Sequence, residues 1–291
     1  MKIGLQIPNF TWPGGVEKIG PTLAEIARTA DSVGFASIWV MDHYFQIRGI
    51  GEHTEPMLEG YSALNFMAAH TQKVTLGTMV SGVNYRTAGF MLKVATTLDV
   101  LSGGRAWLGI GAGWNEQESL GLGLPFPPLK ERFERLEETL QIVTQVWSGD
   151  FSAYHGKHYD LAEPVNSPQP VSKPHPRIMI GGGGEQKTLR IAAQYGDGCN
   201  LFGRLGVEGL THKLDVLKRH CEVVGRDYNE IERTALISAQ PTLDTAGLVK
   251  TCRELAAIGI QHVMLSNVPE VYAIKPLEAI GKQVIPEVAG L

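Results

Sequence analysis

The sequence has few cysteines and no long apolar or basic run, and each of these absences excludes a class of protein. Its 291 residues include three cysteines, which lie far apart and form no CxxC pair, as is typical of a reduced, cytoplasmic protein. No apolar run approaches the ~18 residues of a membrane span, and Pro8 interrupts the N-terminal segment, so we expect neither a signal peptide nor a membrane anchor. The formal net charge of −4 and the lack of a basic block make nucleic acid and membrane surfaces unexpected partners.

Several catalytic motifs are also absent. The first predicted strand carries no His-x-His pair, and the histidines other than His43 fall mostly on predicted loops or helices. We therefore expect no metal site. The sequence also contains no Gly-x-Ser-x-Gly nucleophile elbow and no Walker-type lysine.

What the chain does have is a regular alternation of short β-branched segments with longer amphipathic ones. The pattern predicts strands at 2–7, 36–41, 74–80, 105–112, 177–182, 198–203, 231–239 and 261–266. It predicts helices at 16–34, 57–71, 89–102, 129–148, 185–196, 207–225, 245–259 and 270–289. Such strand–helix pairs close as an α/β protein of the (β/α)8 barrel type, a TIM barrel. An open doubly wound sheet is the alternative.

The simplest domain organisation is a single barrel domain over residues 1–291. Four prolines and alternating Tyr and His break the rhythm at about 151–175. We expect this segment to be a hairpin-like insertion on the barrel surface.

The second predicted strand ends abruptly on two ionisable residues, in the stretch WVMDHYFQ (39–46). In such barrels the chemistry lies at the C-terminal ends of the strands, so Asp42 and His43 are candidates for the active site. Successive side chains of a strand point in opposite directions, so the two residues can have different roles. The alternative is that the pair only caps a loop.

Glycines cluster at two other strand ends. Gly181 to Gly184 let the backbone approach a ligand closely ahead of a predicted helix, whose N-terminus favours a phosphate; a plain turn is the alternative. Gly109, Gly111 and Gly113 are expected to keep side chains away from a ligand over the barrel mouth. Asn115 and Glu116 follow at its rim, where Glu116 by itself is typical of the first turn of a helix.

Taken together, several stretches resemble those of the bacterial-luciferase-like flavin and deazaflavin oxidoreductases, over essentially the whole chain. They are WVMDHYFQ, PMLEGYSALNFMAAHT, VTLGTMVSGVNYR, TTLDVLSGGRAWLGIGAGWNEQE, FPPLKERFERLEETLQI and IMIGGGGEQKTLRIAAQYGDGCN. The chain is particularly similar to the branch that uses coenzyme F420, a deazaflavin. This resemblance implies an oxidoreductase that transfers a hydride between F420 and a small-molecule substrate.

The resemblance also implies roles for individual residues. His43 is expected to face the substrate as the catalytic acid or base, which suits an imidazole that titrates near neutral pH. A cis peptide bond between Met79 and Val80 is expected behind the cofactor ring, and the glycine run is expected to hold the cofactor phosphate. The full set of implied cofactor contacts is Asp42, Met79, Val80, Gly82, Ile110, Gly111, Asn115, Gly181, Gly182, Gly183 and Gly184.

The chain departs from the sugar-phosphate dehydrogenases of this family at two positions. Ala112 stands where they carry a glutamate, and Ile47 where they carry a tryptophan, so an acidic partner and an aromatic wall are expected to be missing. This argues against glucose-6-phosphate and leaves a smaller alcohol, carbonyl or enone, with the direction of transfer open.

Three further expectations complete the sequence reading. FMN is the alternative cofactor, in a luciferase-like monooxygenase. A non-catalytic ligand-binding barrel is the alternative of another class. A homodimer is expected through the apolar surface of MLEGYSALNFMAAHT, residues 57–71.

Overall fold

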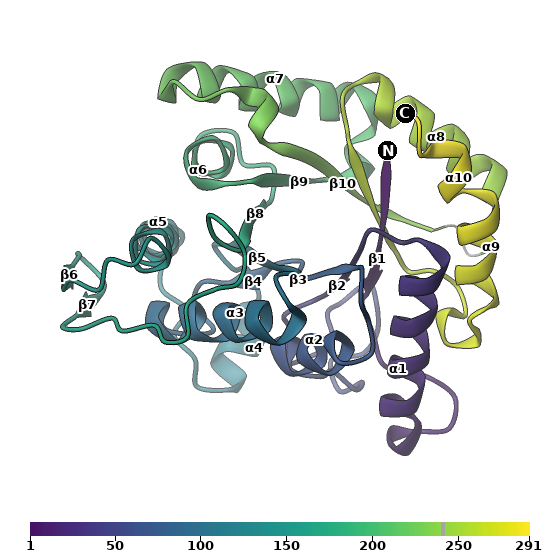
Figure 1. Cartoon of the computed structure of the whole chain (residues 1–291), viewed down its shortest axis with the longest axis horizontal. Helices are drawn as coiled ribbons and strands as arrows, with labels where there is room; N and C mark the ends of the chain where they lie inside the picture. Colours follow the sequence, from purple (N-terminus) through teal and green to yellow (C-terminus); the bar gives the residue numbers. More distant parts are fainter. Residues whose placement is uncertain (240–241) are drawn as a thin grey trace.

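The computed structural model describes residues 1–239 and 242–291, and within them eight parallel strands close into a barrel (Figure 1). The strand order is β3-β2-β1-β11-β10-β9-β8-β5, and β5 pairs back with β3. The strands are β1 (Lys2–Ile7), β2 (Ser37–Val40), β3 (Thr75–Thr78), β5 (Ala106–Gly111), β8 (Arg177–Gly181), β9 (Gly198–Phe202), β10 (Glu232–Ser238) and β11 (His262–Ser266). The prediction of a (β/α)8 barrel is confirmed, and its strand ends meet at one mouth.

Helices surround the barrel because each carries an apolar stripe that packs on the strands. In α1 (Val16–Val33) the residues with helical spacing, among them Leu23, Ile26 and Ala30, are buried. The helices after it are α2 (Gly60–Ala68), α3 (Ala88–Ser102), α4 (Glu116–Gly121), α5 (Leu129–Trp147), α6 (Thr188–Tyr195), α7 (Gly206–Val224), α8 (Thr245–Ala257), α9 (Lys275–Gln283) and α10 (Ile285–Val288). In the described ranges, no helix is both long and apolar enough to cross a membrane.

The barrel interior is filled by a separate cluster of large side chains. It consists of Trp39, Met79, Trp107, Met179 and Met264. The two tryptophan rings pack with their centroids 5.8 Å apart. This cluster fills the inside of the barrel below the mouth.

The proline-rich segment forms a small hairpin outside the barrel. Its strands, β6 (Tyr154–His155) and β7 (Asp160–Leu161), pair antiparallel and lie beside α5 at the edge of the molecule (Figure 1). Glu138 of α5 holds the hairpin turn because its carboxylate accepts the backbone N–H groups of Lys157 and Tyr159, at 2.9 and 3.0 Å.

Three predicted helices have the wrong bounds. The helix expected at 57–71 is Gly60–Ala68. The helix expected at 270–289 is three pieces: a 3-10 turn at Val271–Ala273, then α9 and α10. Pro276 and Pro286 each stand in the first turn of a new helix, where proline's missing N–H is tolerated. The helix expected from residue 185 starts at Thr188, after a turn. The sequence pattern also did not predict the short strand β4 (Ser81–Gly82) or helix α4.

The end of the barrel opposite the mouth holds a buried ionic network. Glu232 at the start of β10 accepts hydrogen bonds from His262 Nδ1 at 2.9 Å and Arg177 at 2.6 Å, with Lys2 at 3.2 Å. His262 Nε2 lies 3.0 Å from Ser37 Oγ. Burial lowers the pKa of His262, in spite of its hydrogen bond to Glu232. Burial alone would raise the pKa of Glu232, but His262 and the charges of Lys2 and Arg177 hold it well below its usual range.

This network predicts that acid destabilises the protein in two steps. Both folded-state pKa values lie below their unfolded values, so the unfolded state binds more protons and the free energy of unfolding falls as pH falls. The contribution of His262 is present above about pH 6.5 and declines below it, and that of Glu232 declines below about pH 4.3. We expect His262→Gln to flatten the fall in melting temperature between about pH 6.5 and pH 5 relative to wild type. An unchanged slope in that range would contradict the assignment.

Candidate active site

A cavity of about 1240 Å³ opens at the mouth of the barrel. It is lined by residues from the ends of several strands and the loops after them, including Gln6, Met41, His43, Ile47, Arg48, Met79, Trp114, Phe202, Arg204, Leu236, Ser238, Asp244, Ser266 and Asn267. Polar and charged side chains therefore line the cavity together with apolar ones. This volume exceeds the roughly 300–1,000 Å³ of an ordinary small-molecule pocket.

His43 is the sequence-predicted residue that lies best for chemistry in this cavity. It follows β2, is 8% exposed and lines the cavity. Its Nδ1 lies 2.8 Å from Oε2 of Glu118, and the hydroxyl of Tyr85 is 3.3 Å from the same nitrogen. The Trp114 ring packs edge-to-face against the imidazole, with centroids 5.4 Å apart. Among the described residues none hydrogen-bonds Nε2, which leaves that nitrogen for the cavity.

Glu118, the acid beside His43, is held in place by α4. Asn115 caps this helix through its side chain and donates from Nδ2 to Oε2 of Glu118 at 2.8 Å. The backbone N–H of Tyr44 donates to Oε1 at 2.7 Å. Glu118 is 0% exposed, so its carboxylate is a buried acceptor that bridges the loop after β2 and the helix after β5.

Asp42 points to the other side of the strand end, as the alternation of side chains predicts. Its side chain is 0% exposed and makes a two-point ion pair with Arg86, at 2.5 and 2.9 Å. Arg86 also pairs with Glu59, which caps α2. Asp42 does not line the cavity. Its contact with a cofactor stays a prediction, but its carboxylate already has a partner in Arg86.

The chain between β3 and β4 crosses the mouth as a bulge. The peptide bond between Met79 and Val80 is cis, as the resemblance implied. Met79 lines the cavity, while Val80 packs between two glycines: a Cβ on Gly181 would lie 2.7 Å from Val80, and one on Gly111 would lie 3.1 Å from it. These two glycines therefore make room for the bulge.

The expectation that Gly109, Gly111 and Gly113 clear space for a ligand is wrong, because a Cβ at each of them would meet other atoms of the protein. A Cβ on Gly109 would lie 1.8 Å from the carbonyl oxygen of Thr78, and one on Gly113 would lie 2.2 Å from Oδ1 of Asn84. Thr78 of β3 approaches β5, and Asn84 in the turn after β4 approaches the turn after β5, so closely that side chains do not fit at these two glycines. The glycines serve the packing of protein against protein.

The remaining predicted cofactor contacts lie around the bulge and do not line the cavity. Ile110 is fully buried in the outer core, and Gly82 pairs with Gly111 in the sheet. Asn115 serves as a helix cap. The run Gly181 to Gly184 follows β8 in a turn in which Gly182 has a φ of 114°. The structure brings Met79, Val80, Gly111 and Gly181 together; it holds His43 and Asp42 apart on opposite faces.

The expected loss of an acidic partner and an aromatic wall is also wrong. Ala112 and Ile47 do lack these groups, but Glu118 supplies a carboxylate to His43 and Trp114 supplies an aromatic face. The sequence reading missed both residues, together with Tyr85 and Arg86. Burial, reinforced by Glu118, raises the pKa of Tyr85, so its hydroxyl stays protonated beside His43.

The luciferase-like monooxygenase family matches residues 1–257. A relative from Kineococcus radiotolerans (strain ATCC BAA-149 / DSM 14245 / SRS30216), an F420-dependent glucose-6-phosphate dehydrogenase, is 30% identical over 88% of this chain and 75% of its own length. An F420-dependent secondary alcohol dehydrogenase in complex with an F420-acetone adduct has a similar structure, with a TM-score of 0.84, 17% identity and coverage of 99% of this chain and 98% of that one.

A further solved structure has the same fold. The coenzyme F420-dependent tetrahydromethanopterin reductase of Methanopyrus kandleri superposes with a TM-score of 0.80 at 18% identity, over 99% of both chains. At this identity the likeness concerns the fold. The family match over most of the sequence and the relative at 30% identity show the family of the chain as well as its fold. The chain belongs to the luciferase-like monooxygenase family.

Proposed function

We propose that this protein is a coenzyme F420-dependent oxidoreductase that acts on a small alcohol, carbonyl or enone. The observation that carries the proposal is the mouth cavity, which is lined by a buried histidine whose Nε2 has no hydrogen-bond partner among the described residues. The F420-dependent enzymes among its relatives and structural neighbours support this cofactor. Three buried, free cysteines support the further proposal of a reducing, cytoplasmic location.

The residues at the mouth fit a large planar cofactor. The cavity of about 1240 Å³ has room for a tricyclic ring together with a small substrate. Met79 at the bulge and the apolar side chains of the opposite wall, Phe202 and Leu236, offer surfaces on which such a ring packs. Six further residues are proposed to position the bulge and α4 around the cofactor ring: Asp42, Val80, Gly82, Ile110, Gly111 and Asn115.

Coenzyme F420, when bound, supplies two-electron hydride transfer to or from a substrate carbon. Oxidation of an alcohol also requires a base for the hydroxyl proton, and reduction of a carbonyl requires an acid at the same place. His43 Nε2 accepts that proton in one direction and returns it in the other. The indole of Trp114 and the side chain of Tyr85 shield the imidazole from bulk water.

The test is a titration of the purified protein with F420 and, separately, with FMN, followed by the absorption spectrum. Saturable binding of F420 with none of FMN supports the proposal. Binding of FMN alone would favour a flavin monooxygenase, and binding of neither would favour a barrel without this chemistry. Turnover is then measured with propan-2-ol, cyclohexenone and glucose-6-phosphate, to find which class of substrate reacts.

The glycine turn after β8 is proposed to bind the cofactor phosphate through its backbone N–H groups. Gly183 is the sharpest position to test, because a Cβ there would meet Lys213 and Leu201 at ordinary distances of 3.8 and 3.9 Å. Gly183→Val should leave folding intact and raise the dissociation constant of F420 about tenfold or more, which corresponds to about 1.4 kcal/mol. Gly290→Val, at a position where a Cβ would meet nothing within 4 Å, is the control. An unchanged constant for Gly183→Val would dispose of the phosphate site.

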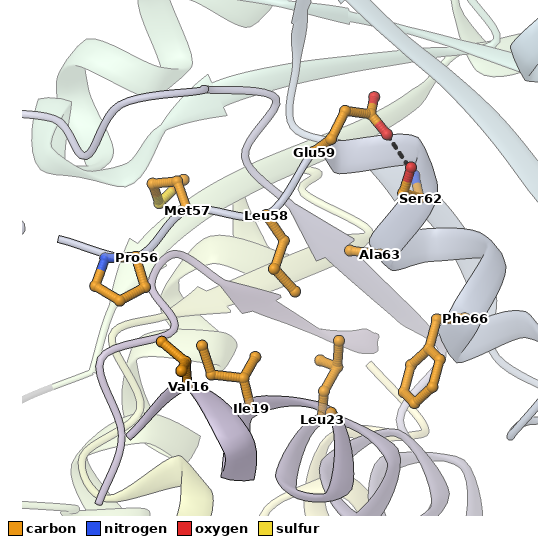
Figure 2. Close-up of a pocket in the computed structure, with 11 residues that line it drawn as sticks. Val16, Ile19, Leu23, Pro56, Met57, Leu58, Glu59, Ser62, Ala63 and Phe66 are labelled. Atoms are coloured by element: carbon orange, nitrogen blue, oxygen red, sulfur yellow. Dashed lines mark hydrogen bonds between the residues drawn. The ribbon is translucent and has the colours of Figure 1, made fainter. Parts of the chain in front are cut away.

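A homodimer is proposed through the face shared by α1 and α2. A groove of about 510 Å³ lies there, between Val16, Ile19 and Leu23 of α1 and a second side that includes Leu58 and Phe66 (Figure 2). Phe66 is 39% exposed and Val16 is 73% exposed, so an apolar surface is uncovered. Sedimentation at micromolar concentration should find a dimer that Phe66→Glu weakens and Val223→Glu, on α7, does not. A wild-type monomer would refute the dimer.

A further inference from the structure

We infer that Glu118 is the positioning residue that fixes the tautomer of His43, so that Nε2 faces the substrate as a proton acceptor. This inference rests on the proposed function for its catalytic consequence, but the tautomer itself is a property of the cofactor-free protein. It concerns a residue 75 positions away from His43 in the sequence.

The partners of the Glu118 carboxylate settle which nitrogen carries the proton. Hydrogens are assigned from the network of partners, and here two of the three contacting groups are N–H donors that cannot reverse their role. The backbone N–H of Tyr44 donates to Oε1 at 2.7 Å. The Asn115 amide donates to Oε2 at 2.8 Å, while its own oxygen accepts the N–H of Glu118 at 3.3 Å as the helix cap.

An ionised carboxylate only accepts hydrogen bonds, so the third contact, at 2.8 Å, is made by His43 with its Nδ1 proton. The neutral imidazole then has an unprotonated Nε2, on the side of the ring left for the cavity. When Nε2 takes the hydroxyl proton of a substrate, the ring becomes an imidazolium whose charge is stabilised by the Glu118 carboxylate. A histidine oriented in this way by a buried acid is the arrangement that general-base catalysis needs.

Two titratable groups contact the ring at Nδ1. Glu118 and Tyr85 approach Nδ1 from α4 and from the loop before α3. The pKa of Tyr85 is raised by burial, so the tyrosine remains neutral. Asp42, the acid adjacent to His43 in the sequence, is paired with Arg86. Glu118 therefore supplies the one negative charge that contacts His43 among the described residues.

Glu118→Gln is the sharpest variant because it keeps the volume and replaces Oε2, which accepts from both His43 and Asn115, by an NH2 group. The amide has one oxygen and one NH2 group, and the fixed N–H of Tyr44 requires the oxygen. The NH2 group is then left facing His43 Nδ1, which has to become an acceptor and move its proton to Nε2. The variant thus presents an N–H to the cavity in place of a lone pair.

The experiment records the 15N resonances of the histidines in cofactor-free protein above their titration range, with His43→Gln used to assign His43. Wild type is expected to show a protonated Nδ1 and an unprotonated Nε2, and Glu118→Gln the reverse. Glu116→Gln, an exposed position on the same helix, should look like wild type. A protonated Nε2 in the wild type overturns the inference whether or not any variant folds, and so does an unchanged tautomer in Glu118→Gln.

A kinetic readout separates positioning from a general loss of structure. With a reacting substrate, Glu118→Gln should lower kcat by about 10²–10⁴, the usual worth of a positioned base, while KM and the F420 dissociation constant change by about threefold or less. If KM and the F420 dissociation constant worsen by as large a factor as kcat, the whole pocket is disturbed and the inference is overturned. If F420 does not bind to wild type, the proposed function fails, and the tautomer measurement still decides the role of Glu118.

Discussion

His43→Ala is expected to lower turnover by about 10²–10⁴ while leaving the affinity for F420 nearly unchanged. The reason is geometric: the imidazole lines the cavity with Nε2 available, but it contributes one edge of a space that many other side chains form. Removing it takes away the proton acceptor and leaves the other lining residues and the glycine turn in place. Turnover and the dissociation constant are measured on the same preparation.

The alternative, a histidine that only caps the loop after β2, makes the opposite prediction. Melting temperature would fall and the turnover of the folded fraction would stay the same. His53→Ala, at an exposed position in the following loop, is the matched control and should match wild type in all three measurements. Full turnover of His43→Ala with a reacting substrate would show that the catalytic assignment is wrong.

The barrel could be predicted from the sequence because its elements are encoded locally. Short β-branched segments indicate strands, and longer segments with apolar residues at helical spacing indicate helices. Both signals depend only on residues that are close together in the sequence. The errors fall where tertiary contacts decide. The last helix breaks at Ile274, whose φ is 65°, and no apolar period predicts such a conformation. β4 is two residues long, too short for any pattern.

The catalytic histidine could be predicted from its place at a strand end, whereas its acidic partner could not. Glu118 stands three residues after the helix cap Asn115, where an acid ordinarily reaches back to the cap and stabilises the first turn. Its sequence position is therefore fully explained without His43. Only the folding of α4 over the loop after β2 brings the two together, and this contact depends on how distant segments pack.

Asp42→Ala is expected to destabilise the protein by about 3–5 kcal/mol, the cost of breaking a buried ion pair by removing one partner. Burial alone would lower the pKa of Arg86, but the Asp42 carboxylate raises it, so the guanidinium stays charged. The Arg86 side chain is 4% exposed, and without Asp42 its charge would have only Glu59 to offset it. Urea unfolding of wild type and variant measures the change in the free energy of unfolding.

Two comparisons make this prediction specific. Glu287→Ala breaks an ion pair with Arg253 whose side chains are 61% and 57% exposed, and should cost no more than about 1 kcal/mol. The double variant Asp42→Ala with Arg86→Met removes both buried charges and should be less destabilised than Asp42→Ala alone, because no unpaired cation remains. If Asp42 instead served the cofactor alone, its alanine variant would lose F420 affinity at unchanged stability. We expect the loss of stability to be the main effect, and not the loss of F420 affinity. The reason is that the carboxylate that the resemblance assigns to the cofactor already holds Arg86 between β2 and α2.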